Sequence, residues 1–396
     1  MNPSQATTSA CEHCLDKERG SFSMYFHIIL TTHCNLQCKY CYGKSCDDIG
    51  TDFGNFEIDY SLPKEINYPI EWLKEFCEKD PECILTFYGG EPMLRVEKIR
   101  RIMDSVPAKH FLIQTNGLFL DKLEPEHINR LHTILVSIDG DQELTDYYRG
   151  AGVYRRVTEN VRKIVGNAFK GEIIARMTVM EETDIFKQVT WLLNDEECPF
   201  SSVHWQLDAG FWKNDFANRQ FEKWIKESYN PGVKRLAKYW VDYMEKSGKI
   251  LKLYPFLAVM NSLLNEEKSL LRCGSGWINY SILTDGNIAP CPIMGGMKDF
   301  YAGHIKTAHP LKLRKILVSR PCSECSILNE CGGRCLYANI TKQWDERQYA
   351  FVCHTVKNMI DSLKREEPRV RRLIKEGKIG LSDFDFLKYN GCEMIP

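Results

Sequence analysis

Three cysteines in the first part of the chain stand at a spacing that suits one soft metal centre. Cys34, Cys38 and Cys41 form a C-x3-C-x2-C pattern directly after the apolar run 24–30. Thiolates on one compact loop can turn inward around an iron–sulfur cluster, and most such clusters have four cysteine ligands. The nearest further cysteine, Cys46, lies outside the tight pattern. The spacing predicts a cluster with one iron open to another ligand. The alternatives are a disulfide-linked loop and a zinc site, although a zinc site usually has four closed ligands.

The composition limits the classes of protein to consider. The chain has 396 residues, of which 43% are hydrophobic and 27% charged, as in an ordinary soluble globular protein with room for one large domain and a smaller one. The formal net charge of −1 gives no electrostatic case for nucleic acid or a membrane surface. We find no apolar run of membrane-spanning length and no apolar signal-peptide core. We therefore expect a cytoplasmic protein.

The cysteine content is unusual for such a protein. Seventeen cysteines in a large chain without an export signal favour metal ligation over disulfides. A protein rich in clusters is sensitive to oxygen, so we expect an anaerobic host. Cys11 and Cys14 form a C-x2-C pair in the polar segment 1–23, which is either an accessory metal or redox site or a loosely ordered extension. Four cysteines that belong to no metal-binding pattern are expected to be buried free thiols: Cys77, Cys83, Cys198 and Cys392.

Short apolar strands alternate with amphipathic helical stretches after residue 24. The strands are expected at 25–30, 84–88, 111–115, 133–138, 173–179 and 203–207. Helices are expected between them at 70–79, 96–104, 154–167 and 184–193, then at 219–228, 233–246, 354–365 and 369–378. Alternating strands and helices predict an α/β fold with a parallel sheet, and about six units fit a partial (β/α)6 barrel.

Polar motifs follow several of these strands, at the edge of a parallel sheet where sites collect. They are Gly89-Gly90-Glu91-Pro92, Gln114-Thr115-Asn116-Gly117 and Ser137-Ile138-Asp139-Gly140. Glycines let backbone approach a ligand closely, and Ser137 and Asp139, two residues apart, should face the same side. An ordinary turn and strand-end capping are the structural alternatives. Arg176, inside an apolar strand, should need an anionic or acidic partner.

A second set of cysteines begins at residue 273. It reads Cys273, Gly286-x4-Cys291, Cys322-x2-Cys325-x5-Cys331-x3-Cys335 and Cys353. The segment 280–291 reads as a hairpin with an Asp-Gly turn. A four-cysteine zinc site would explain only residues 322–335 and would leave Cys273, Cys291 and Cys353 without a role.

Both cysteine sets resemble those of radical S-adenosylmethionine (SAM) enzymes with a SPASM domain. Tyr40 fills the aromatic place of the first signature, C-x3-C-x-aromatic-C. The resemblance implies that the open iron chelates SAM and that an electron from the cluster cleaves SAM to a 5′-deoxyadenosyl radical. It further implies SAM contacts, which carry over to Tyr40, Gly89, Gly90, Glu91, Thr115, Asn116, Ser137, Asp139 and Arg176.

The resemblance also implies two auxiliary [4Fe–4S] clusters, three clusters in all. Auxiliary cluster I takes Cys273, Cys291 and Cys335, and auxiliary cluster II takes Cys322, Cys325, Cys331 and Cys353. Cluster I has one cysteine fewer than in some relatives, so its fourth position is open to a substrate thiolate or amide, or is filled by a remote cysteine or water. Three residues near the barrel edge have an undecided role: Arg149, Gln206 and Asp208.

The implied domains are an extension (1–23), a radical SAM partial barrel (24–210), a helical connector (211–271), a SPASM domain (272–355) and a helical tail (356–396). The implied activity is hydrogen abstraction from a peptide or protein, as in peptide maturases and anaerobic sulfatase-maturating enzymes, with a low-potential flavodoxin- or ferredoxin-like electron donor. One alternative is a SPASM enzyme for a small molecule or cofactor precursor. The other is a non-catalytic iron–sulfur carrier, which would need neither the Gly89-Gly90-Glu91 motif nor Arg176.

Overall fold

The structure is a computed structural model that describes residues 23–41, 56–194, 200–208, 219–342 and 345–391. The predictions for Cys11, Cys14, Cys46, Cys198 and Cys392 lie outside the described residues. Within the described part, no helix is both long and apolar enough to cross a membrane.

One sheet of nine strands organises the molecule, with the strand order β6-β5-β4-β3-β2-β1-β7-β8-β9. Each neighbouring pair from β6 through β1 to β7 is parallel. The pairs β7–β8 and β8–β9 are antiparallel. The strands are β1 (Tyr25–Ile29), β2 (Ile84–Tyr88), β3 (His110–Thr115), β4 (Leu131–Ser137), β5 (Glu172–Val179), β6 (Ser202–Leu207), β7 (Asn279–Ile282), β8 (Asn287–Ala289) and β9 (Gly303–His304).

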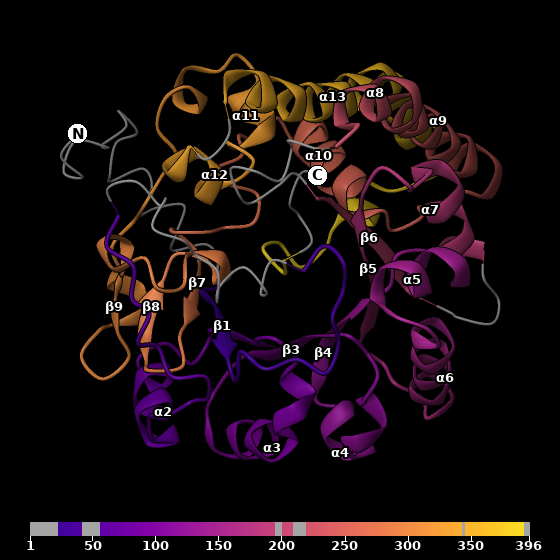
Figure 1. Ribbon diagram of the computed structural model, residues 1–396. Coiled ribbons are helices and arrows are strands. Elements are labelled where there is room, and N and C mark those ends of the chain that lie inside the picture. The colour runs from indigo at the N-terminus through magenta and orange to yellow at the C-terminus, as the bar shows by residue number, and fades with distance from the viewer. Residues whose placement is uncertain (1–22, 42–55, 195–199, 209–218, 343–344, 392–396) are drawn as a thin grey trace.

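Helices cover the outside of this sheet and close its open side. In Figure 1, α2 to α7 lie outside the curved strands, and α8 to α13 lie across the opposite side of the ring. The helices are α2 (Ile70–Glu78), α3 (Val96–Ser105), α4 (Pro125–Ile128), α5 (Gln142–Arg149), α6 (Val153–Gly166), α7 (Ile185–Asn194), α8 (Phe221–Trp224), α9 (Asn230–Ser247), α10 (Tyr254–Leu264), α11 (Leu328–Cys331), α12 (Leu336–Thr341) and α13 (Glu346–Lys375). Short helical turns join them: η3 (Pro92–Arg95), η4 (Leu120–Lys122), η5 (Ile225–Tyr229), η6 (Pro292–Met294), η7 (Lys298–Phe300), η8 (Pro310–Lys312), η9 (Cys322–Glu324) and η10 (Leu381–Phe384).

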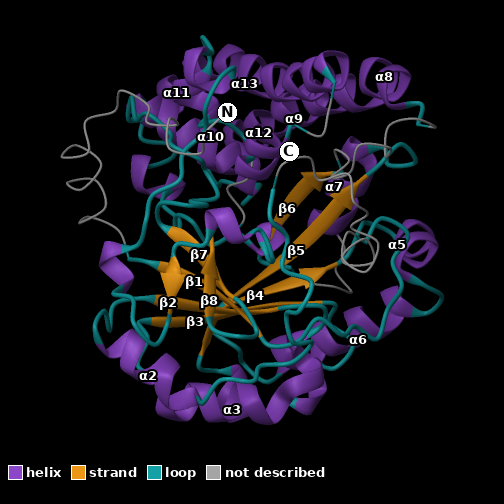
Figure 2. Cartoon of the chain, turned by 60° about the vertical axis from the view of Figure 1, so that its left-hand side comes forward, coloured by secondary structure: helices purple, strands orange, loops and turns teal. Residues whose placement is uncertain are grey.

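The pattern of apolar residues explains why these segments form strands and helices. Strands that are buried on both faces read as continuous apolar runs, and β2 is buried over four of its five residues. The outer helices are amphipathic instead: α3 buries Ile99, Ile102 and Met103, which share one face at helical spacing. Figure 2 shows the strands enclosed between the two groups of helices.

The predicted fold class, an α/β partial barrel built on a parallel sheet, is confirmed. All six predicted strands exist, with ends displaced by no more than two residues. Five helices were not predicted, namely α4, α5, α10, α11 and α12. The two predicted C-terminal helices were wrong, because residues 346–375 form one continuous helix with Pro368 inside it.

The sequence also gave no sign that the predicted hairpin joins the barrel. β7 pairs in parallel with β1, so one sheet runs from the barrel into the cysteine-rich region. The pairing joins segments about 250 residues apart, which local periodicity cannot reveal. The predicted domain boundaries stay predictions.

Candidate functional site

Cys34, Cys38 and Cys41 lie on the loop that follows β1, at the carboxyl end of the parallel strands. The Cys41 N–H donates to the Cys38 carbonyl (3.1 Å), and the Leu36 N–H to the Cys34 sulfur (3.4 Å). Burial raises the pKa of Cys34 and of Cys38, and the charge of Cys41 raises both further. The three thiols therefore lie near one another, and Cys34 is exposed.

Gly89 and Gly90 pack against the strand end that leads into this loop. The Gly90 N–H donates to the Thr31 carbonyl (2.8 Å), and the Glu91 N–H to the His33 carbonyl (2.9 Å). A Cβ on Gly89 would stand 2.2 Å from the Thr31 oxygen, and one on Gly90 would stand 2.4 Å from the His33 oxygen. The glycines are thus required by the chain's own backbone just before Cys34.

The Glu91 side chain points into the protein. Its carboxylate accepts from the Met93 N–H (2.9 Å), the Thr115 hydroxyl (2.7 Å) and the Asn116 N–H (2.7 Å). Burial raises the pKa of Glu91 to about 7, although these donors oppose the shift. Asn116 Nδ2 in turn donates to Asn35 Oδ1 (2.9 Å) and lies 4.0 Å from the Cys34 sulfur. Glu91 therefore fixes the end of β3, which brings Asn116 to the cysteine loop.

Tyr40 is tied to a buried ion pair. Arg149 makes two hydrogen bonds to Asp139 (2.8 and 2.9 Å), and the Tyr40 hydroxyl donates to the same carboxylate (2.5 Å). The Thr178 N–H adds a further bond to Asp139 (3.0 Å). The Lys39 N–H donates to the Tyr148 carbonyl on α5 (2.9 Å). This Tyr40–Asp139–Arg149 network holds the cysteine loop to the ends of β4, β5 and α5.

The sequence analysis named Tyr40, Asp139 and Arg149 but did not predict that they contact one another. Asp139 was expected to face SAM with Ser137, but its side chain is fully buried and bonded to protein groups, whereas Ser137 is half-buried. Arg149, whose role the sequence left undecided, forms a salt bridge with Asp139. The signal that could have found it is the pair of opposite charges on one short strand-to-helix segment, residues 139–149.

Two of the hydrogen-bond partners of Arg176 are neutral groups, and the anionic or acidic partner that the sequence predicted stays a prediction. Its Nη1 donates to the Gly391 carbonyl (2.5 Å) and its Nη2 to Gln206 Oε1 (3.2 Å). Nothing in the sequence indicated that the C-terminal residues would reach β5. Asp208, at the end of β6, instead pairs with Arg219 (3.0 Å), which also binds Glu181.

Three cysteines of the second set form one group beside the hairpin. Burial raises the pKa of Cys273 and of Cys291, and the charge of Cys335 raises both. Ser275 accepts a hydrogen bond from the Cys273 thiol (3.1 Å), and Asn279 Nδ2 donates to the Cys273 carbonyl (3.1 Å). The Oδ1 atom of Asn279 is buried, with no hydrogen-bond partner among the described residues. Cys273 and Cys291 therefore lie close enough to Cys335 for its charge to act on them, and their assignment to auxiliary cluster I stays a prediction.

The other four cysteines line one pocket between η9, α11 and α13. Burial, together with the charges of Cys322, Cys331 and Cys325, raises the pKa of Cys353 to about 11. The Cys322 sulfur lies 3.2 Å from the Tyr349 hydroxyl. Cys335 also borders this pocket, so it lies between the two groups. The full lining is Cys322, Cys325, Ile327, Leu328, Cys331, Gly333, Arg334, Cys335, Ala338, Tyr349, Val352, Cys353 and Val356.

The donor sets suit iron–sulfur chemistry. Each of the three groups presents only thiols, the ligands that such clusters take. Over the described ranges, no three Cys, His, Asp or Glu side chains converge as tightly as the ligands of a single metal ion would. Cys77 and Cys83, which belong to no group, are fully buried as predicted.

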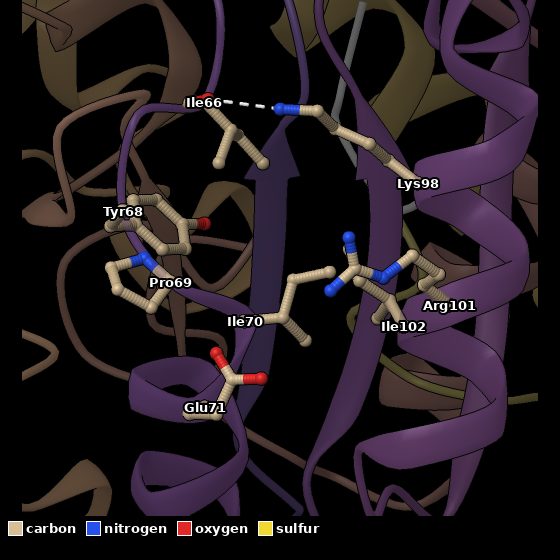
Figure 3. A pocket seen from close by; sticks show the side chains of 8 residues that line it. All are labelled: Ile66, Tyr68, Pro69, Ile70, Glu71, Lys98, Arg101 and Ile102. Carbon is tan, nitrogen blue, oxygen red and sulfur yellow. Dashed lines mark hydrogen bonds between the residues drawn. The ribbon is translucent and has the colours of Figure 1, made fainter.

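A separate pocket on the outside of the barrel has no cysteine in its lining. Figure 3 shows it between the start of α2 and the side of α3, where Lys98 Nζ donates to the Ile66 carbonyl (2.9 Å). Its charged residues belong to the outer surface, and its lining shares no residue with the three thiol groups. The lining is Ile66, Tyr68, Pro69, Ile70, Glu71, Lys98, Arg101 and Ile102.

Comparison with known proteins agrees with this geometry. Residues 28–188 match the family model of the radical SAM superfamily. An uncharacterized protein of Methanothermobacter thermautotrophicus is 29% identical over 34% of this chain, a match that spans only 51% of that protein. A cysteine-type anaerobic sulfatase-maturating enzyme of Clostridium perfringens is 19% identical over 83% of this chain and 92% of its own length.

Solved structures show the same fold. Native anSMEcpe with bound AdoMet and Cp18Cys peptide superposes with a TM-score of 0.66 at 16% identity, over 88% of this chain and 99% of that chain. SuiB of Streptococcus suis bound to precursor peptide SuiA superposes with a TM-score of 0.53 at 16% identity, over 81% and 73%. Residues 28–188, which include the three-cysteine loop after β1, are therefore similar to a radical SAM domain.

Proposed function

We propose that Cys34, Cys38 and Cys41 hold a [4Fe–4S] cluster whose open iron binds SAM, and that the enzyme modifies a peptide or protein. The observation that carries this proposal is the grouping of the three thiols at the carboxyl end of β1, directly beside Gly89, Gly90 and the amide of Asn116. When bound, the cluster supplies the electron that cleaves SAM to methionine and a 5′-deoxyadenosyl radical.

The chain's own residues have positioning roles in this proposal. The backbone of Gly89, Gly90 and Glu91 lines the place of the SAM amino group, because close contact with residues 31–33 fixes it there. The Tyr40–Asp139–Arg149 network keeps the aromatic ring of Tyr40 beside Cys38 and Cys41. Thr115 acts through Glu91, and half-buried Ser137 remains available to SAM.

A peptide or protein substrate is supported by the comparisons. The solved structures of anSMEcpe and SuiB with the same fold contain peptides. Auxiliary cluster I would be held by the thiols of Cys273, Cys291 and Cys335. Auxiliary cluster II would be held by the thiols of Cys322, Cys325, Cys331 and Cys353. Such clusters would take up the electron released from the substrate or hold the substrate, and a low-potential flavodoxin- or ferredoxin-like protein would supply reducing electrons.

The test is an anaerobic count of iron and sulfide per chain with an assay for 5′-deoxyadenosine under dithionite. Three [4Fe–4S] clusters predict about twelve irons. Changing Cys34, Cys38 and Cys41 together to Ala should remove about four irons and all SAM cleavage. Cys83→Ala, in a buried thiol outside the groups, is the matched control and should retain both. A wild-type count of about four irons, or SAM cleavage that survives the triple change, would refute the three-cluster proposal.

A further inference from the structure

The proposed auxiliary cluster I has three thiol ligands, Cys273, Cys291 and Cys335, and lacks a fourth. Most iron–sulfur clusters are held by four protein ligands. The described cysteines outside the three thiol groups are fully buried elsewhere, and the Cys77 thiol is a hydrogen-bond partner of Cys83. Within the described part of the chain, the fourth position therefore calls for a side chain other than cysteine.

Asn279, the first residue of β7, is folded back onto the first of these ligands by a tight turn. The Gly274 carbonyl accepts from the N–H groups of Ile278 (3.0 Å) and Asn279 (2.8 Å). Gly274 has a φ of +75°, a left-handed conformation that favours glycine, and a Cβ there would stand 3.1 Å from the Asn279 Cβ. The Asn279 side chain therefore lies directly against the residue that follows Cys273.

The Asn279 carboxamide is bonded to protein at one end only. Its Nδ2 donates to the Cys273 carbonyl (3.1 Å), a bond that only the NH2 end of the amide can make. Its Oδ1 is buried and accepts no hydrogen bond from the described residues, and the residue as a whole is 4% exposed. A buried acceptor without a donor or a cation is unfavourable. The unbonded end is thus an oxygen, the end that can bind a metal.

Two other polar side chains of this turn have separate roles. The Ser275 hydroxyl lies 3.1 Å from the Cys273 sulfur. Metal ligation removes the thiol proton, so this hydroxyl can donate to the thiolate and orient it. Trp277 Nε1 is buried and has no hydrogen-bond partner among the residues that the structure describes. The turn thus presents one unpartnered acceptor, which suits iron, and one unpartnered donor, which suits the sulfur atoms of a cluster.

We propose that Asn279 Oδ1 is the fourth ligand of auxiliary cluster I, which then has three thiolates and one carboxamide oxygen. This inference rests on the proposed function, because it needs that cluster. A neutral oxygen in place of a thiolate makes the cluster less negative and raises its reduction potential, in the same direction as histidine ligands do in Rieske centres. Oxygen also suits such iron less well than thiolate does, so the iron bound to Asn279 is the first to be lost on oxidation.

The test uses the full chain with Cys34, Cys38 and Cys41 changed to Ala, because the proposed first cluster also has an open iron and would give the same signals. This parent protein should contain about eight irons. Mild oxidation with ferricyanide under anaerobic conditions should remove about one iron per chain and produce the electron paramagnetic resonance (EPR) signal of a [3Fe–4S] cluster.

Two variants of Asn279 in this parent test the ligand. Asn279→Asp keeps the shape of the side chain and adds a negative charge, so ferricyanide should remove less iron and an EPR titration should give a lower reduction potential. Asn279→Leu removes the oxygen, so iron loss should be faster and the EPR spectrum of the reduced protein should change. Asn287→Asp is the matched control and should behave as the parent, because Asn287 is on β8 of the same hairpin and its Nδ2 is bonded to Asp285.

A second measurement needs no change at residue 279. In parent protein whose asparagines contain a magnetic carbon isotope in the carboxamide group, electron–nuclear double resonance on the reduced auxiliary clusters should detect a coupled carbon nucleus.

Three results would overturn the inference: retention of all iron by the parent under ferricyanide, equal behaviour of the Asn279 and Asn287 variants, or absence of the carbon coupling. With about eight irons in the parent before oxidation, each of these rejects only Asn279 and leaves the proposed clusters intact. Fewer irons in the parent before oxidation would instead reject the proposed auxiliary clusters, and the inference with them.

Discussion

The two cysteine regions of the molecule contain a buried arginine each, but the arginines are bound differently. Arg149, behind the first loop, pairs with the buried carboxylate of Asp139. Arg272, directly before Cys273, donates to the carbonyls of Ala258 and Glu330 and to the Ser262 hydroxyl. The first region depends on a charge pair, and the second depends on hydrogen bonds to backbone and hydroxyl groups of α10 and α11.

This difference matters because the two regions have different tasks in the proposed function. The first loop has to present an exposed thiol group to SAM while staying in place, and a buried ion pair with a tyrosine gives a defined geometry at one end of the loop. The second region collects thiols from turns and helices that pack on one another. The two regions should therefore respond separately to mutation.

The largest effect is expected for Arg149→Met. Removing one partner of a buried ion pair leaves the Asp139 carboxylate uncompensated, which costs about 3–5 kcal/mol of unfolding free energy. Urea unfolding and iron analysis should show this loss together with about four irons lost from the first loop. The double variant with Asp139→Asn should recover part of the stability. Loss of all iron would show that the regions are not separate.

Glu91 should make the first region sensitive to pH. Its folded pKa of about 7 is above the value of an unfolded glutamate, so the stability it contributes is present at low pH and lost as pH rises from about 4.5 to 7. The wild type should lose about 3 kcal/mol relative to Glu91→Gln over this interval. Urea unfolding of both proteins at pH 5 and pH 8 measures the difference. Parallel pH profiles would contradict the assignment.

Arg272→Met should have a smaller effect than Arg149→Met. The acceptors left behind are neutral, and a buried neutral acceptor without a partner costs about 1–3 kcal/mol. The expected result is a lower urea midpoint with iron loss limited to the auxiliary groups and with SAM cleavage retained under dithionite. Iron lost from the first loop instead would reverse the comparison.

Two tyrosines give the smallest and most closely matched comparison. The Tyr40 hydroxyl donates to a carboxylate, so Tyr40→Phe should cost about 1.5–3 kcal/mol. The Tyr349 hydroxyl contacts the Cys322 sulfur, so Tyr349→Phe should cost about 0.5–1.5 kcal/mol. Thermal unfolding of the two single variants measures both values. Equal losses would show that the charge of Asp139 adds nothing to the hold on Tyr40.

The sequence predicted the parts of the site that depend on neighbours along the chain. The spacing of Cys34, Cys38 and Cys41 requires one loop, and apolar runs at strand length predicted all six barrel strands. In the structure, one pocket is lined by five cysteines of the second set, namely Cys322, Cys325, Cys331, Cys335 and Cys353. The glycines of Gly89-Gly90 were expected to let backbone approach a ligand closely, and in the structure it is the backbone of residues 31–33 that approaches them.

Only the tertiary structure decided which distant groups meet. The Glu91 side chain points inward, where the Thr115 hydroxyl at the end of β3 donates to it. The Asp139 side chain is buried and accepts hydrogen bonds from Arg149 and Tyr40. Arg176 donates to a backbone carbonyl 215 residues away in the chain. No local pattern encodes such partners, since packing and the satisfaction of buried polar groups select them after the strands have assembled. Cysteine spacing and strand periodicity are properties of the chain itself, so the sequence alone determined them.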